Sequence, residues 1–359
     1  MFLSHKLTGA AAALMMIATP AWAMGKKHQK SGAHFAREFR YDRFYKGNTH
    51  THSLRSDGDS SPEKVIAWYR DHGYQFLVLT DHNFQSAWGE FASLEQPGRF
   101  VVVPGEEVTF AHDRPAGETD GRPVRAVHLS QLCGTETIPG QKINPAEKAL
   151  QTAVDLIGAQ TGAVAIVNHP NYEWGLPLAS LRAVPNFHLM EIANQHFDVH
   201  NAGDATHPST EVLWDSLLTD GRTIYGVASD DEHDLIRTQT ELGFPPRPPG
   251  KGWLQVAADV AGSLEPKAIC SAIDRGAFYF STGAEFASVE AKSDRMSLVL
   301  SAGMPAAKFE FFGAGGRPLQ TAQGTSSDYV LKGGEGYVRA RVTLPDGHQA
   351  WTQAARVNE

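Results

Sequence analysis

Histidines and acidic residues of this chain are grouped in short motifs that could bind metal ions. His50 and His52 are separated by one residue, and the motifs Thr80-Asp81-His82 and Asn168-His169-Pro170 follow further along the chain. Because alternate side chains of an extended strand point to the same face, a His-x-His pair on a strand directs both imidazoles toward one ion. Imidazole and carboxylate ligands together suit zinc, manganese or iron, and so many candidate ligands suggest more than one ion.

Each motif also has an ordinary structural explanation when it stands alone. Thr80-Asp81-His82 could cap a helix, Ser56-Asp57-Gly58 could form a turn, and Glu107 could pair with an arginine. Six of the sixteen histidines, however, lie at or near the end of a predicted strand, namely His50, His52, His82, His128, His169 and His233. The structural explanation needs a separate reason for each histidine, whereas a metal site explains all of them together.

The elements that must position these motifs alternate between short strand-like runs and helices. Runs such as 76–79 and 163–167 are continuously apolar, as in strands that are buried on both faces of a parallel sheet. The segment 144–159 predicts a helix, with Asn144 as its N-cap and Pro145 in its first turn. About seven such units fit an α/β barrel better than an open sheet, and chemistry in a parallel barrel gathers at the C-terminal ends of its strands.

The character of the sequence changes at about residue 285. Residues 285–359 predict several β-strands separated by glycine-rich turns and no helix. We therefore expect an α/β barrel at 41–284, which carries the metal-binding motifs, followed by a small β-sandwich-like module. The Pro- and Gly-rich stretch 237–251 predicts a long loop, a kind of segment that is often functional.

The first 23 residues have the features of a secretory signal peptide. An apolar run from Leu7 to Pro20 precedes Ala21-Trp22-Ala23, which fits a small-x-small cleavage site. Cleavage after Ala23 would leave a flexible leader at 24–40 and a periplasmic or secreted protein without a membrane segment. The alternative is a retained N-terminal anchor. Cys133 and Cys270 could pair outside the cytoplasm, but each lies in or near a predicted core element, so we expect two buried thiols.

Composition and charge argue against some functions. The chain has 359 residues, of which 42% are hydrophobic and 20% charged, as in ordinary globular proteins. Its formal net charge is -8 and it has no basic stripe, so a long nucleic acid is not expected as a partner. A mononucleotide or short oligonucleotide stays open as a substrate, and so does the oligomeric state.

The order of the motifs resembles the PHP family (polymerase and histidinol phosphatase domain). His-x-His with Ser-Asp-Gly, then Thr-Asp-His, Pro-Gly-x-Glu, a strand histidine, Asn-His-Pro and a final Asp-x-His look like the family's full set, over about residues 44–285. The resemblance implies a distorted, TIM-barrel-like (β/α)7 barrel with two to three divalent metal ions (Zn, Mn or Fe). The ligands that it implies are His50, His52, Asp57, His82, Glu107, His128, His169, Asp231 and His233.

Two features make the resemblance less specific. The final motif carries a doubled acid: Asp231 keeps the Asp-x-His spacing, whereas Asp230 keeps the Ser-Asp pair with Ser229, so either could be the ligand. Downstream, Gly252-Trp253 and Tyr337-Val338-Arg339 are similar to motifs of the CehA/McbA branch. That branch includes exported metallohydrolases that act on esters or carbamates, so this likeness widens the expected substrate class.

The expected activity is hydrolysis by water that a multinuclear metal cluster activates. Beyond the ligands, Arg55 could bind a phosphate group, Asp81 could orient a ligand histidine, and Glu191 could support a ligand or transfer protons. A solvated arginine, a cap and a structural ion pair are the alternatives for these three residues.

We expect a small-molecule ester as substrate, and a phosphatase or phosphodiesterase is favoured. The first alternative is a metal-dependent hydrolase of carboxylesters, carbamates or amides, and the second is a non-catalytic metal- or ligand-binding protein. Basic groups facing the metals would favour the phosphoesterase, and an apolar cup would favour the first alternative.

Overall fold

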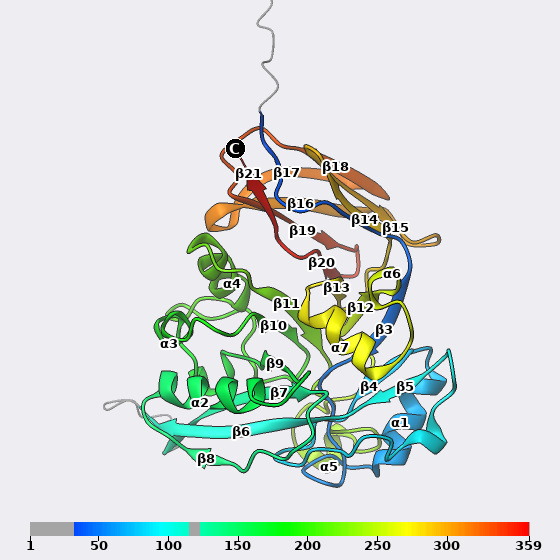
Figure 1. Cartoon of the computed structure of the whole chain (residues 1–359), viewed down its shortest axis with the longest axis vertical. Helices are drawn as coiled ribbons and strands as arrows, with labels where there is room; N and C mark the ends of the chain where they lie inside the picture. The colour runs from blue at the N-terminus through cyan, green and yellow to red at the C-terminus, as the bar shows by residue number, and fades with distance from the viewer. Residues whose placement is uncertain (1–31, 115–122, 359) are drawn as a thin grey trace, which may run out of the picture.

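The computed structural model describes residues 32–114 and 123–358, which form a mixed α/β fold rich in strands (Figure 1). Within these residues the strands form three sheets. The largest contains, in spatial order, β1 (His34–Phe35), β21 (Ala355–Asn358), β19 (Tyr337–Thr343), β20 (Gln349–Trp351), β13 (Phe278–Ser281), β12 (Trp253–Ala257), β3 (Phe44–Asn48), β4 (Phe76–Val78) and β5 (Val101–Val103). Off this path, β16 (Ala307–Gly313) pairs with β19 and with β17 (Arg317–Gly324).

The second sheet carries two of the predicted metal ligands, Glu107 and His128, on its strands. Its order is β11 (Tyr225–Ser229), β10 (Leu189–Asn194), β9 (Val164–Val167), β7 (Val124–Leu132), β6 (Gly105–Asp113) and β8 (Gln141–Lys142). The third sheet consists of β18 (Ser326–Val330), β15 (Arg295–Leu300), β14 (Phe286–Lys292) and β2 (Phe39–Tyr41).

The predicted (β/α)7 barrel is not found as one continuous parallel sheet. β3, β4 and β5 pair in parallel, as do β9, β10 and β11, but β7 runs antiparallel to both β6 and β9. The reason for the antiparallel pair of β6 and β7 is local: ten residues separate Asp113 from Val124, fewer than the dozen or more that a parallel crossover needs, and β7 pairs with β6 along its whole length. Isolated parallel bridges, Thr51 with Glu232 and His82 with Glu107, join the two larger sheets beside the predicted ligands.

Seven α-helices are found in the described residues. They are α1 (Pro62–Asp71), α2 (Ala146–Gly158), α3 (Leu178–Ala183), α4 (Thr210–Thr219), α5 (Gln239–Leu242), α6 (Ala258–Ala261) and α7 (Pro266–Asp274). None of them is long and apolar enough to cross a membrane. The short α5 lies within the stretch 237–251 that was predicted to be a loop throughout.

The start of α2 differs from the prediction. Its first residue is Ala146, and Asn144 does not cap it. The Asn144 side chain instead accepts a hydrogen bond from the backbone N–H of Asp113, with 2.7 Å between nitrogen and oxygen. This bond connects the segment before α2 to the last residue of β6. Local sequence marked Asn144 as a good cap, but a residue distant in the chain supplies a competing partner.

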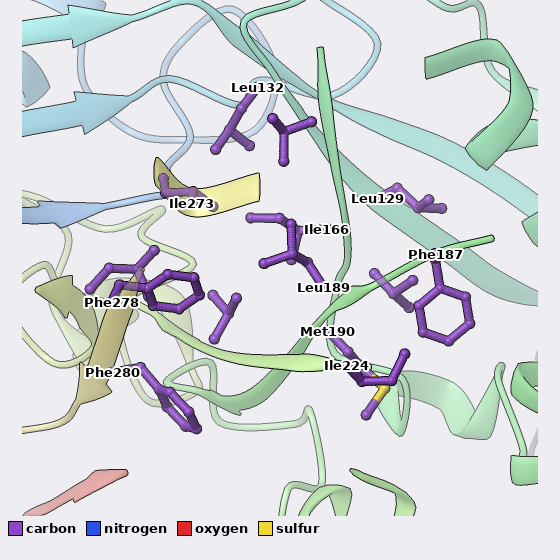
Figure 2. Packing of buried hydrophobic residues seen from close by; sticks show 14 of the residues in the cluster. Leu129, Leu132, Ile166, Phe187, Leu189, Met190, Ile224, Ile273, Phe278 and Phe280 are labelled. Carbon is purple, nitrogen blue, oxygen red and sulfur yellow. The ribbon is translucent and has the colours of Figure 1, made fainter. Parts of the chain in front are cut away.

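The main core lies between the second sheet, β13 and the surrounding helices. Figure 2 shows apolar side chains of these elements converging, among them Leu129, Ile166, Leu189, Ile273 and Phe280, all of which are buried. Burial of each such side chain contributes about 1.5–3 kcal/mol. This packing makes a rigid base for the strand ends from which the predicted ligands project.

The N-terminal segment is ordered earlier than predicted. The signal peptide at 1–23 lies outside the described residues, as does the first part of the leader expected at 24–40. From residue 33 onward the expectation of a flexible leader is wrong, because β1 pairs with β21 and β2 pairs with β14. The burial of Ala33 and Phe35 in the C-terminal core fixes this segment.

The two cysteines form a disulfide, so the expectation of two buried thiols is wrong. Cys133 follows β7 and Cys270 lies on α7, and their Cα atoms are 6.5 Å apart. The expectation rested on each cysteine lying near a core element. It could not include the packing of α7 against β5 and β9, which brings two residues 137 positions apart into contact.

The C-terminal strands (red and orange in Figure 1) are connected to the rest of the molecule by hydrogen bonds and by buried charge. β20 pairs with β13 across the boundary predicted at residue 285, and the ring of Trp351 stacks on Phe280. Arg339 on β19 is 1% exposed and forms a paired contact with Asp215 on α4, with 2.6 and 2.7 Å between nitrogen and oxygen.

We expect Arg339→Met to lower the free energy of unfolding by about 3–5 kcal/mol, because it leaves the Asp215 carboxylate buried without its partner. Urea denaturation measures the change. The double variant Arg339→Met with Asp215→Asn should lose less than Arg339→Met alone, since no uncompensated charge remains.

A matched control is Arg295→Met, which breaks an exposed pair with Asp328 and should cost under about 1 kcal/mol. Equal costs for Arg295→Met and Arg339→Met would contradict a structural role for the buried pair.

Candidate metal centre

All nine predicted ligands meet at one place in the structure. Their donor atoms form four overlapping groups, and the atoms within each group lie within 4.8 Å of one another. The groups are His52, Asp57, His82 and His233; His50, His52 and Glu107; His50, His169 and Asp231; and His82, Glu107 and His128. The overlap describes one continuous cluster.

Glu107 lies at the centre of this cluster. Its carboxylate oxygens lie 3.1 to 3.4 Å from ring nitrogens of five histidines, which are His50, His52, His82, His128 and His169. Glu107 is 1% exposed, and Asn168 donates a hydrogen bond to it over 2.8 Å. Contrary to the prediction, Glu107 does not end a strand: it is the third residue of β6, and His128 lies in the middle of the antiparallel β7.

The donor set fits metal binding on an observation of this structure. The Nε2 atoms of His50 and His52 are buried and make no hydrogen bond among the described residues, although carboxylate oxygens of Glu107 and Asp231 lie 3.2 to 3.4 Å from them. In both rings the other nitrogen is occupied: Nδ1 of His50 is 2.9 Å from Glu191, and Nδ1 of His52 is 3.3 Å from Ser56 Oγ. An imidazole with one nitrogen hydrogen-bonded and the other free is the usual arrangement of a metal-binding histidine.

The electrostatics of the cluster divide its histidines into two kinds. Burial disfavours the charged form of His50, His52, His82 and His169, and it lowers the pKa of His82 to about 4 and also lowers that of His52. At His50 burial is outweighed by the carboxylates of Asp231, Glu107 and Glu191, which raise its pKa well above the usual value.

The carboxylates of the cluster respond in the opposite sense. Burial would raise the pKa of Glu107 and of Asp231, but the surrounding histidines outweigh it and hold both values well below the usual range. Buried carboxylates that stay ionised attract cations, and bound divalent ions would offset their charge.

A loop held by Asp81 positions His52 and Asp57. The Asp81 carboxylate accepts hydrogen bonds from the backbone N–H of Ser53 over 2.7 Å and from the Ser56 hydroxyl over 2.9 Å. The loop then turns tightly at Gly58, where a Cβ atom would lie 2.7 Å from the backbone of His52. Asp81 is therefore placed as a positioning residue, and the glycine of the Ser-Asp-Gly motif is required by this close approach.

Glu191 holds the opposite side of the cluster. It is 1% exposed and accepts hydrogen bonds from the backbone N–H of His169 over 2.8 Å, from Asn194 over 2.9 Å and from Ser229 over 2.5 Å, besides its contact with His50. All of its contacts orient other residues. Its place fits the predicted support of a ligand better than proton transfer to a substrate.

The doubled acid has two separate tasks in the structure. Asp231 lies in the metal groups, where Asn194 also donates to it over 3.0 Å. Asp230 points away and accepts hydrogen bonds from the Tyr69 hydroxyl and from the backbone N–H groups of Gly250, Lys251 and Gly252. Asp230 therefore fixes the end of the long loop, and the Asp-x-His spacing identifies the residue in the cluster.

The structure does not bring Arg55 to the open side of the cluster. Its guanidinium pairs with Glu90 and packs against the rings of Phe84 and Phe91. A different arginine lines the pocket that opens over the cluster: Arg247, from the stretch predicted to be a functional loop. Asp234 fixes Arg247 by a side-chain contact of 2.9 Å and by accepting its backbone N–H over 2.8 Å.

Tyr172 and His196 also line this pocket, and neither was among the predicted site residues. His196 Nε2 lies 3.1 Å from the Arg247 guanidinium. Phe197, which stacks on His196, and Phe244, which lies against Arg247, stack on each other at the rim and are 47% and 37% exposed. In the sequence, only the length and composition of the segment 237–251 indicated that this loop could supply a residue, such as Arg247, to the pocket over the cluster.

No protein-family model and no curated protein matches this sequence. Several solved structures have a similar arrangement. One is a two-domain protein from Bacteroides vulgatus described as containing a predicted PHP-like metal-dependent phosphoesterase; it is 16% identical, the match covers 89% of this chain and 96% of that chain, and the TM-score is 0.43.

Two further solved structures match over 52% of this chain and 87% of their own. A candidate metal-dependent phosphoesterase from Bifidobacterium adolescentis is 11% identical with a TM-score of 0.37. An amidohydrolase from Chromobacterium violaceum, with bound sulfate and no metal, is 16% identical with a TM-score of 0.31. Similarities of this size do not assign the chain to a family.

We expect Asp231→Asn and Asp230→Asn to have different effects on metal content. Asp231→Asn removes a charged donor from the cluster and should lower the bound metal by at least one ion per chain. Asp230→Asn should keep the metal but lower the melting temperature, because an amide replaces the carboxylate that accepts three backbone N–H groups. Elemental analysis and thermal unfolding of both proteins measure these effects. Full metal content in Asp231→Asn would argue against the assignment.

Proposed function

We propose that this protein is an exported metal-dependent hydrolase that acts on small phosphate esters, as a phosphatase or phosphodiesterase. The observation that carries the proposal is Arg247, a guanidinium held beside the metal groups in the pocket that opens over them. A planar guanidinium matches the oxygen atoms of a phosphate, and Nε2 of His196 accepts a hydrogen bond from Arg247 over 3.1 Å and so helps to hold the guanidinium in place. Basic groups facing the metals favour the phosphoesterase among the expected activities.

Two to three divalent ions (Zn, Mn or Fe) held by the nine ligands would supply Lewis acidity, which lowers the pKa of water to about 7 and offsets charge that develops on the substrate. The protein's own residues do the rest. Glu191 orients His50 and His169, and Asp81 holds the loop that presents His52 and Asp57. Arg247, which Asp234 and His196 hold in place, binds and orients the phosphate group from the open side.

The motif order supports a PHP-type protein with a distorted (β/α)7 barrel as the finer description of the fold, and its downstream motifs support the CehA/McbA-like branch. The isolated bridges that join the two larger sheets at the cluster agree with a barrel whose hydrogen bonding is interrupted. We further propose a domain boundary near residue 285. A periplasmic or secreted location is supported by the signal-like N-terminus and by the disulfide, since structural disulfides persist in oxidising compartments.

Hydrolysis of carboxylesters or carbamates is the second candidate. The exposed pair Phe197 and Phe244 at the pocket rim favours it, because an apolar ester could pack there. The walls nearest the metal groups are nevertheless polar: apart from Val199 and Tyr172, the lining consists of histidine, acidic and arginine side chains.

The test is hydrolysis of p-nitrophenyl phosphate, bis-p-nitrophenyl phosphate and p-nitrophenyl acetate by protein of known metal content. We expect phosphoester turnover that is lost when the metal is removed and in the variant His50→Ala with His52→Ala. Acetate turnover without phosphoester turnover would support the second candidate. Absence of bound metal after reconstitution with zinc or manganese would contradict both hydrolase proposals and favour a non-catalytic ligand-binding protein.

Arg247→Met should lower kcat/KM for the phosphoesters by about 10- to 150-fold, which corresponds to the roughly 1.5–3 kcal/mol of a hydrogen bond to a charged group. The effect on p-nitrophenyl acetate, which carries no phosphate, should be under threefold. Arg295→Met, which changes an exposed arginine of the third sheet, serves as the control. An equal loss on all three substrates would show that Arg247 supports the loop rather than the phosphate.

A further inference from the structure

A second cavity, of about 200 Å³, lies away from the metal centre. It is enclosed by β2, the start of β11, the turn between α7 and β13, and the segment that leads into β21, and it shares no lining residue with the pocket over the cluster. Tyr225, the first residue of β11, lines this cavity, whereas Asp231, one of the nine candidate metal ligands, follows the other end of the same strand. The cavity is therefore at the opposite end of the strands from the metal centre.

The walls of the cavity are aromatic. They include Phe39, Tyr41, Tyr225, Phe278 and Tyr279, and the rings of Phe39 and Tyr41 stack with their centroids 4.8 Å apart. A cavity of about 150 Å³ with apolar walls holds a benzene molecule. The volume here therefore suits a single substituted ring or an apolar group of that size.

The charged groups of the cavity are all cationic. Three arginines line it, namely Arg37, Arg275 and Arg356, and none of its lining residues is acidic. This is unusual in a chain whose net charge is -8. Arg356 is bound by the backbone carbonyls of Leu218 and Arg222, so its charge is partly compensated.

The other two arginines, Arg37 and Arg275, are exposed to solvent and lack a counter-charge among the described residues. Arg37 makes no hydrogen bond or ion pair there, and Arg275 makes one contact of 3.3 Å, with the carbonyl of Val260. Asp274, next to Arg275, is paired with His188. Both guanidinium groups are close enough to Tyr41 to oppose the rise in pKa that burial causes at its hydroxyl.

The Tyr41 hydroxyl is a further polar group of the cavity. Tyr41 as a whole is 7% exposed and lines the cavity, and its hydroxyl has no hydrogen-bond partner among the described residues. The hydroxyl oxygen itself is open to solvent, so water hydrates it and both guanidinium groups when no ligand is bound. One carboxylate could replace that water at all three groups, with charge-assisted hydrogen bonds to the arginines.

We propose that this cavity binds a small organic anion with an aromatic body, whose carboxylate or other anionic group contacts Arg37, Arg275 and the Tyr41 hydroxyl. The ring would lie among the aromatic walls, where it loses contact with water. Because the cavity borders both β11 of the second sheet and the residues 352–356 of the C-terminal strands, a bound ligand also stabilises their docking. This site is independent of the activity proposed for the metal centre.

The test uses two ligands of the same shape that differ in charge, 4-(trifluoromethyl)benzoate and 4-(trifluoromethyl)benzamide, titrated into the purified protein and followed by fluorine NMR. We expect the benzoate to bind at least tenfold more tightly than the benzamide and to raise the melting temperature. Phenylphosphonate, added as a competitor, shows whether a phosphonate displaces the carboxylate. Equal affinities for benzoate and benzamide, or no binding of either, would overturn the proposal.

Variants locate the site. Arg37→Gln with Arg275→Gln should remove the preference for the benzoate, and Tyr41→Phe should weaken it severalfold without loss of fold, as thermal unfolding checks. Arg40→Gln is the matched control: Arg40 alternates with Phe39 and Tyr41 on β2, so it faces the other side, where it pairs with Glu290. Benzoate binding that survives in the double arginine variant and disappears in His50→Ala would place the ligand at the metal centre and overturn the proposal.

Discussion

The burial of one carboxylate among five histidines is the constraint on which the rest of this structure depends. Glu107 is almost inaccessible to water, and Asp231 and Glu191 are buried within the same network. Buried ionised groups are stable only when opposite charges and hydrogen bonds surround them. Here the histidines supply part of that compensation, and their free nitrogens leave a set of donors that divalent cations would complete.

A network of polar residues beyond the ligands keeps these groups in place. Asp81, Glu191, Asn168 and Asn194 each bind a ligand or the backbone next to one, and Asp230 anchors the loop that carries Arg247. The rigid base under this network is apolar, since packed strands and helices leave little freedom for the strand ends. The chemistry of the site therefore depends on both layers, the packed core and the hydrogen-bonded shell above it.

The C-terminal strands are tied to the same framework. β20 extends the sheet that contains β3, the buried Arg339 and Asp215 join β19 to α4, and the cavity lined by Tyr41 and Arg37 lies where the C-terminal strands meet β11 and β13. The metal centre and this cavity occupy opposite ends of shared strands. The C-terminal strands and β3, which leads to the metal centre, therefore belong to one hydrogen-bonded sheet, through the pairs of β20 with β13, β13 with β12 and β12 with β3.

Much of the metal centre could be predicted from the sequence, because short-range spacing determines which side chains share a face. The His-x-His pair, the Ser-Asp-Gly turn and the Asp-x-His motif each have a local geometry that any strand or tight turn imposes, and all nine predicted ligands do meet in the structure. The cap of α1 is equally local: Ser61 accepts the N–H of Lys64, with Pro62 in the first turn. Most strands of the C-terminal region were likewise visible as apolar runs between glycine-rich turns.

Features that depend on long-range packing could be decided only by the tertiary structure. The antiparallel course of β7, the disulfide between Cys133 and Cys270, and the pairing of Arg55 with Glu90 all depend on which distant elements become neighbours. The same holds for Arg247 and Tyr41, whose surroundings come from segments far apart in the chain. Sequence spacing determines the local direction of a side chain, whereas its partners, and therefore its role, are set by the packing of the whole chain.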